Sequence, residues 1–485
     1  MSLINSYRYG SAAPIEGTII FRSVSSVSTT FSVRSVGADN PIWSDGVNVF
    51  QPVMVGGVST VTFPWTDASE KTVVIVVDVP GDIRGISETE FINKGLTYID
   101  LSKCINYRDS IILTNNNLLT TFIAPSTTVR LDSLKGINLA GCDITGPIDL
   151  SPIYGFTRGQ LFFNDNINVT SFIPPQFFDD IEDFSASNVG WITLDLSTLI
   201  QNSAGTRSLN IASIYLVNFI SPLVNQTDVI NNFNGSSDFA FPNLAGTIDL
   251  SMYSNLRSFY LNRSNNSVGA ANTDCTLIKL PKSSNLDFYM GNFDNAQIDG
   301  LSGPFIFTGR QMRVSDFAVT TSFDIGDNAP TSSTSAGSSF ISNMPELIGT
   351  LNLAWYKGSG GLTIGGCPKV TGLILPNGLS GSYGAWNFTG FNVGFYIDFT
   401  IWPQCLKTSN RDFRFNDNNM SADIVNHILV DLAAIASSET FGGDFVNRNI
   451  FCDGNNAAPD GTSGGFDGLT AITDLANYGI TVISN

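Results

Sequence analysis

The tetrapeptide Ile-Asp-Leu-Ser occurs at Ile99–Ser102, Ile148–Ser151 and Ile248–Ser251, and Leu-Asp-Leu-Ser occurs at Leu194–Ser197. Degenerate copies follow at Ile298-Asp299, Leu351–Ala354 and Ile397–Thr400. The steps between the seven Asp or Asn positions are 49, 46, 54, 50, 53 and 46 residues. Because the spacing is so narrow, the sequence indicates a repeat architecture with a period of about fifty residues.

Other features keep the same period. We call each Asp- or Asn-containing copy of the tetrapeptide a mark. A second strand-like segment follows the mark, as at Ile112-Leu113, Leu161–Phe163, Phe259–Leu261 and Phe413–Phe415. A proline then closes an apolar segment 25, 25, 27 and 24 residues after the Asp or Asn, at Pro125, Pro174, Pro222 and Pro376. Asparagine recurs before the next Asp or Asn, at Asn138, Asn188, Asn243, Asn292, Asn343 and Asn392.

Each fifty-residue unit is therefore predicted to form two coils of about 22 to 27 residues. Short apolar strands of successive coils stack as parallel ladders, which pair their backbone groups. In each mark we expect the apolar flankers to be buried and the Asp or Asn to be exposed. The recurring asparagines are expected in turns, where their side chains bond nearby backbone groups. An antiparallel sandwich is the alternative, but a sandwich does not repeat every fifty residues.

The chain divides into three predicted parts. Residues 1–80 read as a small antiparallel β-domain, residues 81–420 as a leucine-rich-repeat-like β-solenoid of about seven repeats, and residues 421–485 as an α/β cap. Within the solenoid, residues 331–339 (TSSTSAGSS) read as a protruding low-complexity loop. The cap is predicted to hold two short helices. The first begins after Ser421 with a stripe of Ile424, Ile428, Leu432 and Ile435. The second runs near 467–478 with Leu469, Ile472 and Leu475 on one face, before Gly479.

Composition narrows the class of protein. Charged residues make up only 14% of the chain, against roughly 25% in ordinary soluble domains, so the polar surface is built largely from Asn, Ser, Thr and Gly. The net charge of −18 disfavours nucleic acid and anionic membrane surfaces as partners. The first fourteen residues lack the apolar segment of a secretory signal, and no stretch has the roughly 18 apolar residues of a membrane span.

The six cysteines, Cys104, Cys142, Cys275, Cys367, Cys405 and Cys452, lie far apart in the sequence and include no Cys-x-x-Cys pair. Zinc ligation or a redox motif is therefore disfavoured. We expect these residues to be buried free thiols, because cysteine packs as a small hydrophobe.

Stretches in the repeats and in the cap resemble two known classes of repeat protein. Phe184–Ser197 and Phe239–Ser251 resemble the leucine-rich repeats of bacterial surface proteins. The stretches Asn418–Ser421, Val425–Leu432 and Leu469–Val482 look like the cap of repeat proteins in phage virions. The resemblance runs from about residue 95 to the end and implies a tail, fibre or head-fibre component. The repeats here are rich in Phe rather than Leu, and Ile480 stands where that cap would have Trp.

The only histidine, His427, lies four residues from both Asp423 and Asp431 on the first predicted cap helix. A catalytic histidine with an orienting carboxylate is conceivable, but a solvated histidine paired with acids is the stronger interpretation. Carboxylates also gather at Asp179, Asp180, Glu182 and Asp183, and at Asp324 and Asp327. Glycoside hydrolysis would need two of them about 5 to 9.5 Å apart in a cleft; solvated turn acids are the simpler reading.

The loop with Asp453–Asn456, Asp460-Gly461 and Asp467-Gly468 concentrates oxygen ligands that could bind calcium. Neither the EF-hand spacing nor the calcium-binding nonapeptide repeat is present, so no metal or cofactor is predicted. Trp191, Trp355, Trp386 and Trp402 are expected to fill the core rather than to stack on sugars.

These features together predict a non-enzymatic virion protein, with no catalytic residue, that presents its solenoid for receptor binding or assembly. A glycan-degrading tailspike and a bacterial surface adhesin are the alternatives. The predicted setting is a virion, or alternatively a bacterial cell surface, with other virion proteins and possibly a host glycan or protein as partners. The chain is expected to be oligomeric through residues 1–80, where Trp43, Phe50, Met54, Phe63 and Trp65 exceed the apparent needs of a small core.

Overall fold

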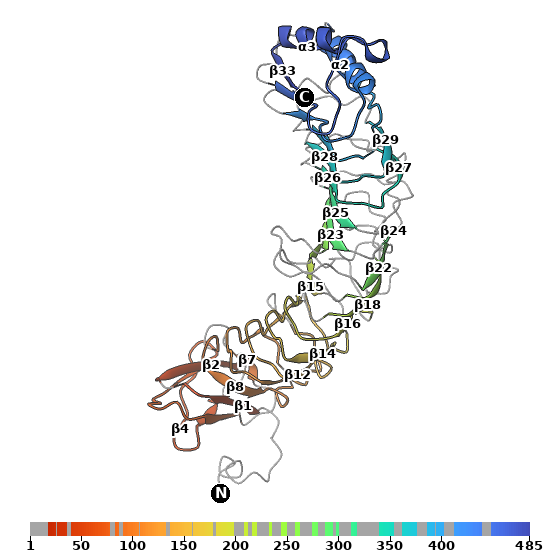
Figure 1. The fold of residues 1–485 in the computed structure, drawn as a ribbon. Helices are drawn as coiled ribbons and strands as arrows, with labels where there is room; N and C mark the ends of the chain where they lie inside the picture. Colours follow the sequence, from red (N-terminus) through yellow and green to blue (C-terminus); the bar gives the residue numbers. More distant parts are fainter. Residues whose placement is uncertain are drawn as a thin grey trace. The chain divides into compact units, whose positions relative to one another are not determined.

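A computed structural model gives the architecture. It describes residues 18–25, 27–35, 40–77, 83–86, 91–105, 107–131, 136–157, 159–177, 181–197, 208–211, 216–220, 232–234, 244–249, 258–261, 274–279, 287–293, 297–299, 312–317, 339–353, 361–375, 386–392, 394–401, 412–438 and 448–485. The chain forms two compact units, Met1–Phe241 and Pro242–Asn485. The fold is mainly β, as the sequence predicts, and is a β-solenoid with small N-terminal sheets and two helices near the C-terminus among the described residues (Figure 1).

The N-terminal part of the first unit contains two mainly antiparallel sheets. One includes β1 (Thr18–Ser23), β3 (Ile42–Ser44), β4 (Val49–Phe50), β6 (Lys71–Val76) and β8 (Leu96–Asp100), and the other contains β2 (Thr29–Ser35), β5 (Val58–Phe63) and β7 (Ile83–Ile86). Their alternating side chains meet in an aromatic core, in which the Phe21 ring of β1 packs 4.5 Å from the Phe31 ring of β2, and Phe63 stacks 5.1 Å from Trp65.

This core corrects the expectation of surplus aromatic residues. Trp43 and Phe63 are fully buried, and Trp65 is 5% exposed. Trp43 Nε1 donates to Ser59 Oγ at 3.0 Å, and Trp65 Nε1 donates to Asp45 Oδ2 at 3.1 Å. For these three residues the expectation of a surplus beyond the core was therefore wrong, because the facing sheet and the two polar acceptors were not visible in the sequence. The other two, Phe50 and Met54, are half-buried.

The solenoid begins at β8. This strand pairs antiparallel with β1 on one side, with Phe21 opposite Ile99. On its other side it pairs parallel with β10 (Thr121–Ile123), with Ile99 opposite Phe122. The first coil is thus built directly on the N-terminal sheet, and β1, β2, β7 and β8 lie together beside the first coils (Figure 1).

One long parallel ladder runs through the coils of the first unit. It contains β9 (Ile111–Ile112), β11 (Ile137–Asn138), β13 (Gly159–Phe162), β15 (Ile181–Ser185), β17 (Ser208–Asn210) and β19 (Asn232–Asn234). The marks and the segments before the recurring prolines form separate two-stranded parallel sheets: β12 (Gly146–Asp149) pairs with β14 (Val169–Ile173), and β16 (Thr193–Asp195) pairs with β18 (Asn218–Ile220). The mark and the proline segment therefore occupy equivalent places in alternate coils.

The second unit repeats this arrangement. Its long ladder contains β21 (Ser258–Leu261), β23 (Asp287–Phe293), β25 (Met312–Phe317), β26 (Ser339–Ser342), β28 (Leu362–Gly365), β30 (Trp386–Thr389), β31 (Phe413–Arg414), β32 (Arg448–Phe451) and β33 (Ile480–Ile483). The marks lie in β20 (Gly246–Asp249), which pairs with β22 (Cys275–Lys279) and through it with β24 (Gln297–Asp299), and in β27 (Gly349–Asn352), which pairs with β29 (Val370–Ile374).

The marks bury their apolar flankers as predicted, with Ile148, Leu150, Leu194 and Leu196 at most 1% exposed. Their acids are less exposed than expected: Asp195 is exposed, but Asp149, Asp249, Asn352 and Asp398 are half-buried and Asp100 is buried. The cause is local. The Asp oxygen accepts the backbone N–H two residues later in four marks, from Ser102, Ser151, Ser197 and Thr400 at 2.8 to 2.9 Å. Each such mark is a turn closed by its own carboxylate.

Asparagines of another set form the buried polar rows of the solenoid. Asn116, Asn166 and Asn418 are completely buried and Asn456 nearly so. Each ends a segment of the long ladder and donates to backbone carbonyls of its own coil and of the preceding coil; Asn166 Nδ2, for example, donates to Leu139 O and to Phe163 O. Of the asparagines that recur in the sequence, Asn188 and Asn343 adopt a left-handed backbone with φ of 55°. The expectation of turns was wrong for Asn138, which ends β11, and for Asn292, which lies within β23; Asn243 lies outside the described residues.

Three of the mark strands begin with a glycine, which lies three residues before the Asp or Asn of the mark. Gly146, Gly246 and Gly349 have φ of 87°, 74° and 85°, and at each the register of the parallel pair shifts by one residue. A bulge with positive φ is accessible to glycine without steric cost. In these three repeats the mark therefore extends to Gly-x-apolar-Asp/Asn, which is longer than the pattern recognised in the sequence.

The C-terminal cap has the predicted helices. Helix α2 (Ala422–Ser437) buries Ile428, Leu432 and Ile435, and helix α3 (Gly468–Asn477) follows a short 3₁₀ turn, η1 (Ser463–Gly465). On α3 the apolar stripe is only partly inward, because Leu475 is buried while Leu469 is 55% exposed. Gly479 ends α3 with a φ of 74°.

Candidate functional site

The long ladder of the second unit presents an open sheet face near the C-terminus. In β28 to β33 the inward residues Leu362, Ile364, Phe388, Phe413 and Ile450 are all fully buried. The outward residues Thr363, Asn387, Arg414, Phe451 and Ile483 stand in register across five strands, and all are half-buried. Parallel pairing places each of them about 4.8 Å from the next strand, so they form one continuous row.

Arg414 is the centre of this row. Its guanidinium carbon lies 4.0 Å from the centroid of the Phe451 ring, and its Nη2 lies 2.5 Å from Asp412 Oδ2. Asn449 Nδ2 donates to Asp412 Oδ1 at 3.2 Å. The ion pair and the ring contact hold the guanidinium in place, so its free N–H groups are positioned for an incoming acceptor before any ligand binds.

Two amide oxygens flank Arg414. Within the described part of the chain, Asn387 Oδ1 and Asn416 Oδ1 are shielded from solvent and have no hydrogen-bond partner. Asn387 stands opposite Arg414 on the neighbouring strand, and Asn416 lies two residues after Arg414, beyond the end of β31. The face therefore combines a guanidinium, an aromatic ring and amide groups, which suits recognition of hydroxyl or carboxylate groups.

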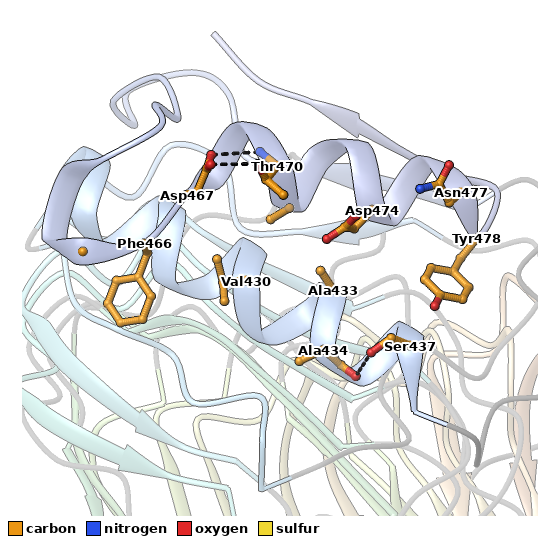
Figure 2. Close-up of a pocket in the computed structure, with 12 residues that line it drawn as sticks. Val430, Ala433, Ala434, Ser437, Phe466, Asp467, Thr470, Asp474, Asn477 and Tyr478 are labelled. Atoms are coloured by element: carbon orange, nitrogen blue, oxygen red, sulfur yellow. Dashed lines mark hydrogen bonds between the residues drawn. The ribbon is translucent and has the colours of Figure 1, made fainter.

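A pocket also lies between the two cap helices (Figure 2). It has a volume of about 560 Å³, and Val430 and Ala433 of α2 face Ala471 of α3 across it. Polar side chains surround this apolar floor: Ser437, Asp467, Thr470, Asp474, Asn477 and Tyr478. Asp467 is committed to the N-terminus of α3, where it accepts from Thr470 N at 2.9 Å and Thr470 Oγ1 at 2.7 Å, and these bonds lower the pKa of its carboxyl.

His427 is packed between two aromatic rings beside this pocket. The Tyr396 ring lies 4.2 Å away on one face and the Phe466 ring 3.9 Å away on the other, both nearly parallel to the imidazole. Asp431 Oδ2 lies 3.8 Å from His427 Nε2 and accepts the Tyr396 hydroxyl hydrogen bond. Burial raises the pKa of the Asp431 carboxyl, and burial together with this hydrogen bond raises the pKa of Tyr396.

The stack agrees with the interpretation of a histidine beside an acid, but the imidazole is half-buried between two rings rather than solvated. The exposed carboxylate of Asp423 is bound by its own helix end, whereas Asp431 is the acid near the imidazole. Among the described contacts, His427 meets the two rings, which cover its faces, and the Asp431 carboxylate. The arrangement joins α2 to the loop before α3 and to the preceding coil, so its role is to position the cap.

In the loop considered as a calcium site, the Asp460 carboxylate oxygens accept hydrogen bonds from neighbouring residues of the cap. Asp460 accepts from Thr462 N, Ser463 N, Ser463 Oγ and Asn426 Nδ2, and the Ser463 bonds lower the pKa of its carboxyl most. Asn456 belongs to the buried asparagine row. In the described ranges no three His, Cys, Asp or Glu side chains gather as a metal ion would require.

Of the carboxylate clusters, only Glu182 and Asp183 lie among the described residues. They are consecutive in β15, and Asp183 accepts from Gln160 Nε2 at 2.8 Å. Asp179, Asp180, Asp324 and Asp327 lie outside the described residues, as does residue range 331–338 of the low-complexity loop.

Of the tryptophans, Trp191 is fully buried, with its ring 5.9 Å from that of Phe172 and 6.4 Å from that of Phe184. It fills the core, as expected. Trp386 lies in β30, while Trp355 and Trp402 lie outside the described residues. Five cysteines are free and buried as predicted, and Cys405 lies outside the described residues.

The Arg414 face was missed in the sequence, although Phe413–Phe415 was recognised as a strand. The available signal was the alternation itself: in a half-buried strand the residue between two buried aromatics points outward. What the sequence did not reveal is that the neighbouring coil would place Phe451 beneath the guanidinium.

Comparison with known protein families, with curated proteins and with solved structures finds no match to this chain. None of the helices in the described ranges has both the length and the apolar character needed to cross a membrane.

Proposed function

We propose that this chain is a non-enzymatic virion component, of tail, fibre or head-fibre type, that binds a host-surface receptor through the open sheet face around Arg414. The supporting observation is the contrast between the two sides of that sheet. Inward positions keep one apolar character from coil to coil, whereas the outward row changes from Thr363 to Asn387, Arg414 and Phe451. A solenoid with a constant interior and a varied exterior is suited to presenting an extended recognition surface.

The leucine-rich-repeat character of the coils supports the same proposal. An inward apolar residue of the long ladder is followed three positions later by an interior Asn or Cys at Leu113/Asn116, Leu139/Cys142, Phe163/Asn166 and Phe415/Asn418. This spacing agrees with the end of the leucine-rich-repeat pattern, in which Asn or Cys occupies the turn after the strand. Repeats of that class commonly recognise partners through the exposed face of their sheet.

The virion setting is supported by the resemblance of the cap sequence to phage repeat proteins and by the low charge content of the chain. Antibodies raised against the purified chain test it directly. Labelling of purified particles in electron micrographs is the expected result. Labelling confined to bacterial surfaces would favour an adhesin, and release of oligosaccharides from capsule or cell-wall glycan would favour a tailspike enzyme.

Receptor binding is tested with an R414A/F451A double variant. Binding of the purified chain to intact host cells should weaken by at least about tenfold, because a clustered Arg and aromatic pair typically dominates an interface. Ile374→Ala is the matched control, because Ile374 is a 46%-exposed apolar residue of β29, outside the long ladder. Equal binding by all three proteins, with unchanged thermal midpoints, would place the receptor site elsewhere.

A further inference from the structure

The N-terminal sheets have two free edges next to each other. Among the described strands, β4 is the last strand of the six-stranded sheet, and β5 is the last strand of the three-stranded sheet. Residues 51–57 join the two strands directly. Sheet edges that lie open at the surface are sites where natural proteins control association with other chains.

A groove of about 400 Å³ lies between these edges. It is lined by Val49, Phe50, Gln51, Pro52, Thr60, Val61 and Thr62. The two threonines already have partners, because Thr60 Oγ1 bonds Ser32 Oγ and Thr62 Oγ1 bonds Thr30 Oγ1, both at 2.8 Å. Covering this groove would therefore leave neither hydroxyl without a hydrogen bond.

A ridge of exposed valines borders the groove. Val47, Val49, Val53 and Val55 are 84%, 62%, 75% and 77% exposed. The aromatic residues of the same segment turn inward, so the exposure is not a consequence of a poorly formed core: Phe50 packs edge-on against Phe63 at 5.4 Å. Contiguous exposed apolar side chains of this kind mark interaction surfaces.

The segment that forms the ridge and the groove carries no charge. No Asp, Glu, Lys or Arg occurs from Gly46 to Thr66, in a chain with a net charge of −18. Asp45, at its start, is bound internally by Trp65 Nε1, Val47 N and Asn48 N. Two copies of the chain would repel each other over most of their acidic surfaces, but not at this segment.

We propose that this surface, residues 46–62, is the contact between two copies of the chain. A ridge and a groove on one patch can be complementary to themselves about a two-fold axis, so that the valine ridge of each copy enters the groove of the other. The absence of charge on both sides makes a second copy the occupant that this patch fits best, since an oppositely charged partner would find nothing to pair with. This goes beyond receptor binding, which a monomer could perform.

Light scattering on the full-length chain between about 1 µM and about 100 µM tests the proposal. The wild-type mass should approach twice the 52.1 kDa of one chain as the concentration rises. A V53E/V55E variant should weaken dimerisation by at least about tenfold, because two carboxylates would be placed against their own copies. Both positions are highly exposed, so the thermal midpoint should be unchanged.

Val27→Glu is the matched control, because Val27 is 65% exposed on the same domain but outside the patch. It should dimerise like the wild type. A monomeric wild type would overturn the proposal, as would equal loss of dimer in the V27E control or an undisturbed V53E/V55E dimer. Because the mass is measured without a receptor or a particle, a failure here would be distinct from a failure of receptor binding.

Discussion

Asn456 Oδ1 accepts a hydrogen bond from the backbone N–H of Asn418 at 3.1 Å, and both side chains lie in the interior of the solenoid. The same oxygen accepts Met420 N at 3.1 Å, while Asn456 Nδ2 donates to Phe415 O at 2.9 Å. One buried amide thus satisfies donors and an acceptor of the preceding coil. Since buried polar groups are costly when unpaired, these amides fix the order in which coils stack.

Asn166→Ala should lower the stability of its coil by about 2–3 kcal/mol, because it leaves the N–H of Ile144 and the carbonyls of Leu139 and Phe163 without their side-chain partner. The measurement is the urea midpoint together with hydrogen exchange at the Ile144 amide. Asn168→Ala is the control, because Asn168 is exposed and bonds only Asp143 in the described contacts. Equal effects of the two substitutions would show that the buried row has no special role.

Asp195→Ala should destabilise the turn after β16 by about 1 kcal/mol, because Ser197 N loses its acceptor at 2.8 Å. Asp195→Asn should be nearly neutral, because an amide oxygen can accept the same hydrogen bond, and the equivalent position in β27 is Asn352. The readout is hydrogen exchange at Ser197. If the Asn variant exchanged as fast as the Ala variant, the turn would depend on charge and not on the hydrogen bond.

The cap should lose stability in acid through Asp460. Its folded-state pKa is depressed, chiefly by the Ser463 hydrogen bonds, from an ordinary value of 3.8. A depressed carboxyl stabilises the folded state above its unfolded pKa, and that stabilisation is lost as the pH falls below about 4. The thermal midpoint should therefore fall between about pH 5 and about pH 2, and less steeply in Asp460→Asn. Identical pH profiles for the two proteins would contradict this.

The buried thiols should be unreactive in the folded chain. Burial raises the pKa of Cys142 and Cys452 to about 12 and that of Cys275 and Cys367 to about 11, and it also raises the pKa of Cys104. Since the thiolate is the reactive form, a Cys405→Ser variant should show no reaction with a thiol reagent at about pH 8 until it is unfolded. Rapid labelling of the native variant would show that its coils open.

Much of the solenoid was predictable because it follows from local pattern. The apolar residues of each mark recur with the period of the coil, and burial of Ile148 and Leu150 requires only that equivalent strands stack. The cap helices were likewise visible as a stripe on α2 and a glycine after α3. The glycines before the marks kept the same spacing and could also have been found, since a recurring Gly indicates a backbone that needs positive φ.

Other features depended on residues far apart in the chain. From the sequence, Trp43 exceeds the needs of a small core, but in the structure it is fully buried and its indole N–H donates to Ser59. His427 looked solvated, yet two rings cover its imidazole, from Tyr396 in the preceding coil and from Phe466 in the loop before α3. Sequence spacing gives no measure of such contacts, because they arise only when coils are laid on one another.

The sequence by itself determined the period of the coils, the parallel strands at the marks and the apolar interior. Each of these depends on the short-range alternation of apolar residues and on the pairing of equivalent strands in successive coils. Only the tertiary structure decided which asparagines lie inside, where Asp412, Arg414 and Phe451 meet, and which valines of residues 46–62 remain outside. The physical reason is that a polar or surface residue has no fixed environment of its own. Its burial and its partners are set by the neighbouring coil or sheet that happens to face it.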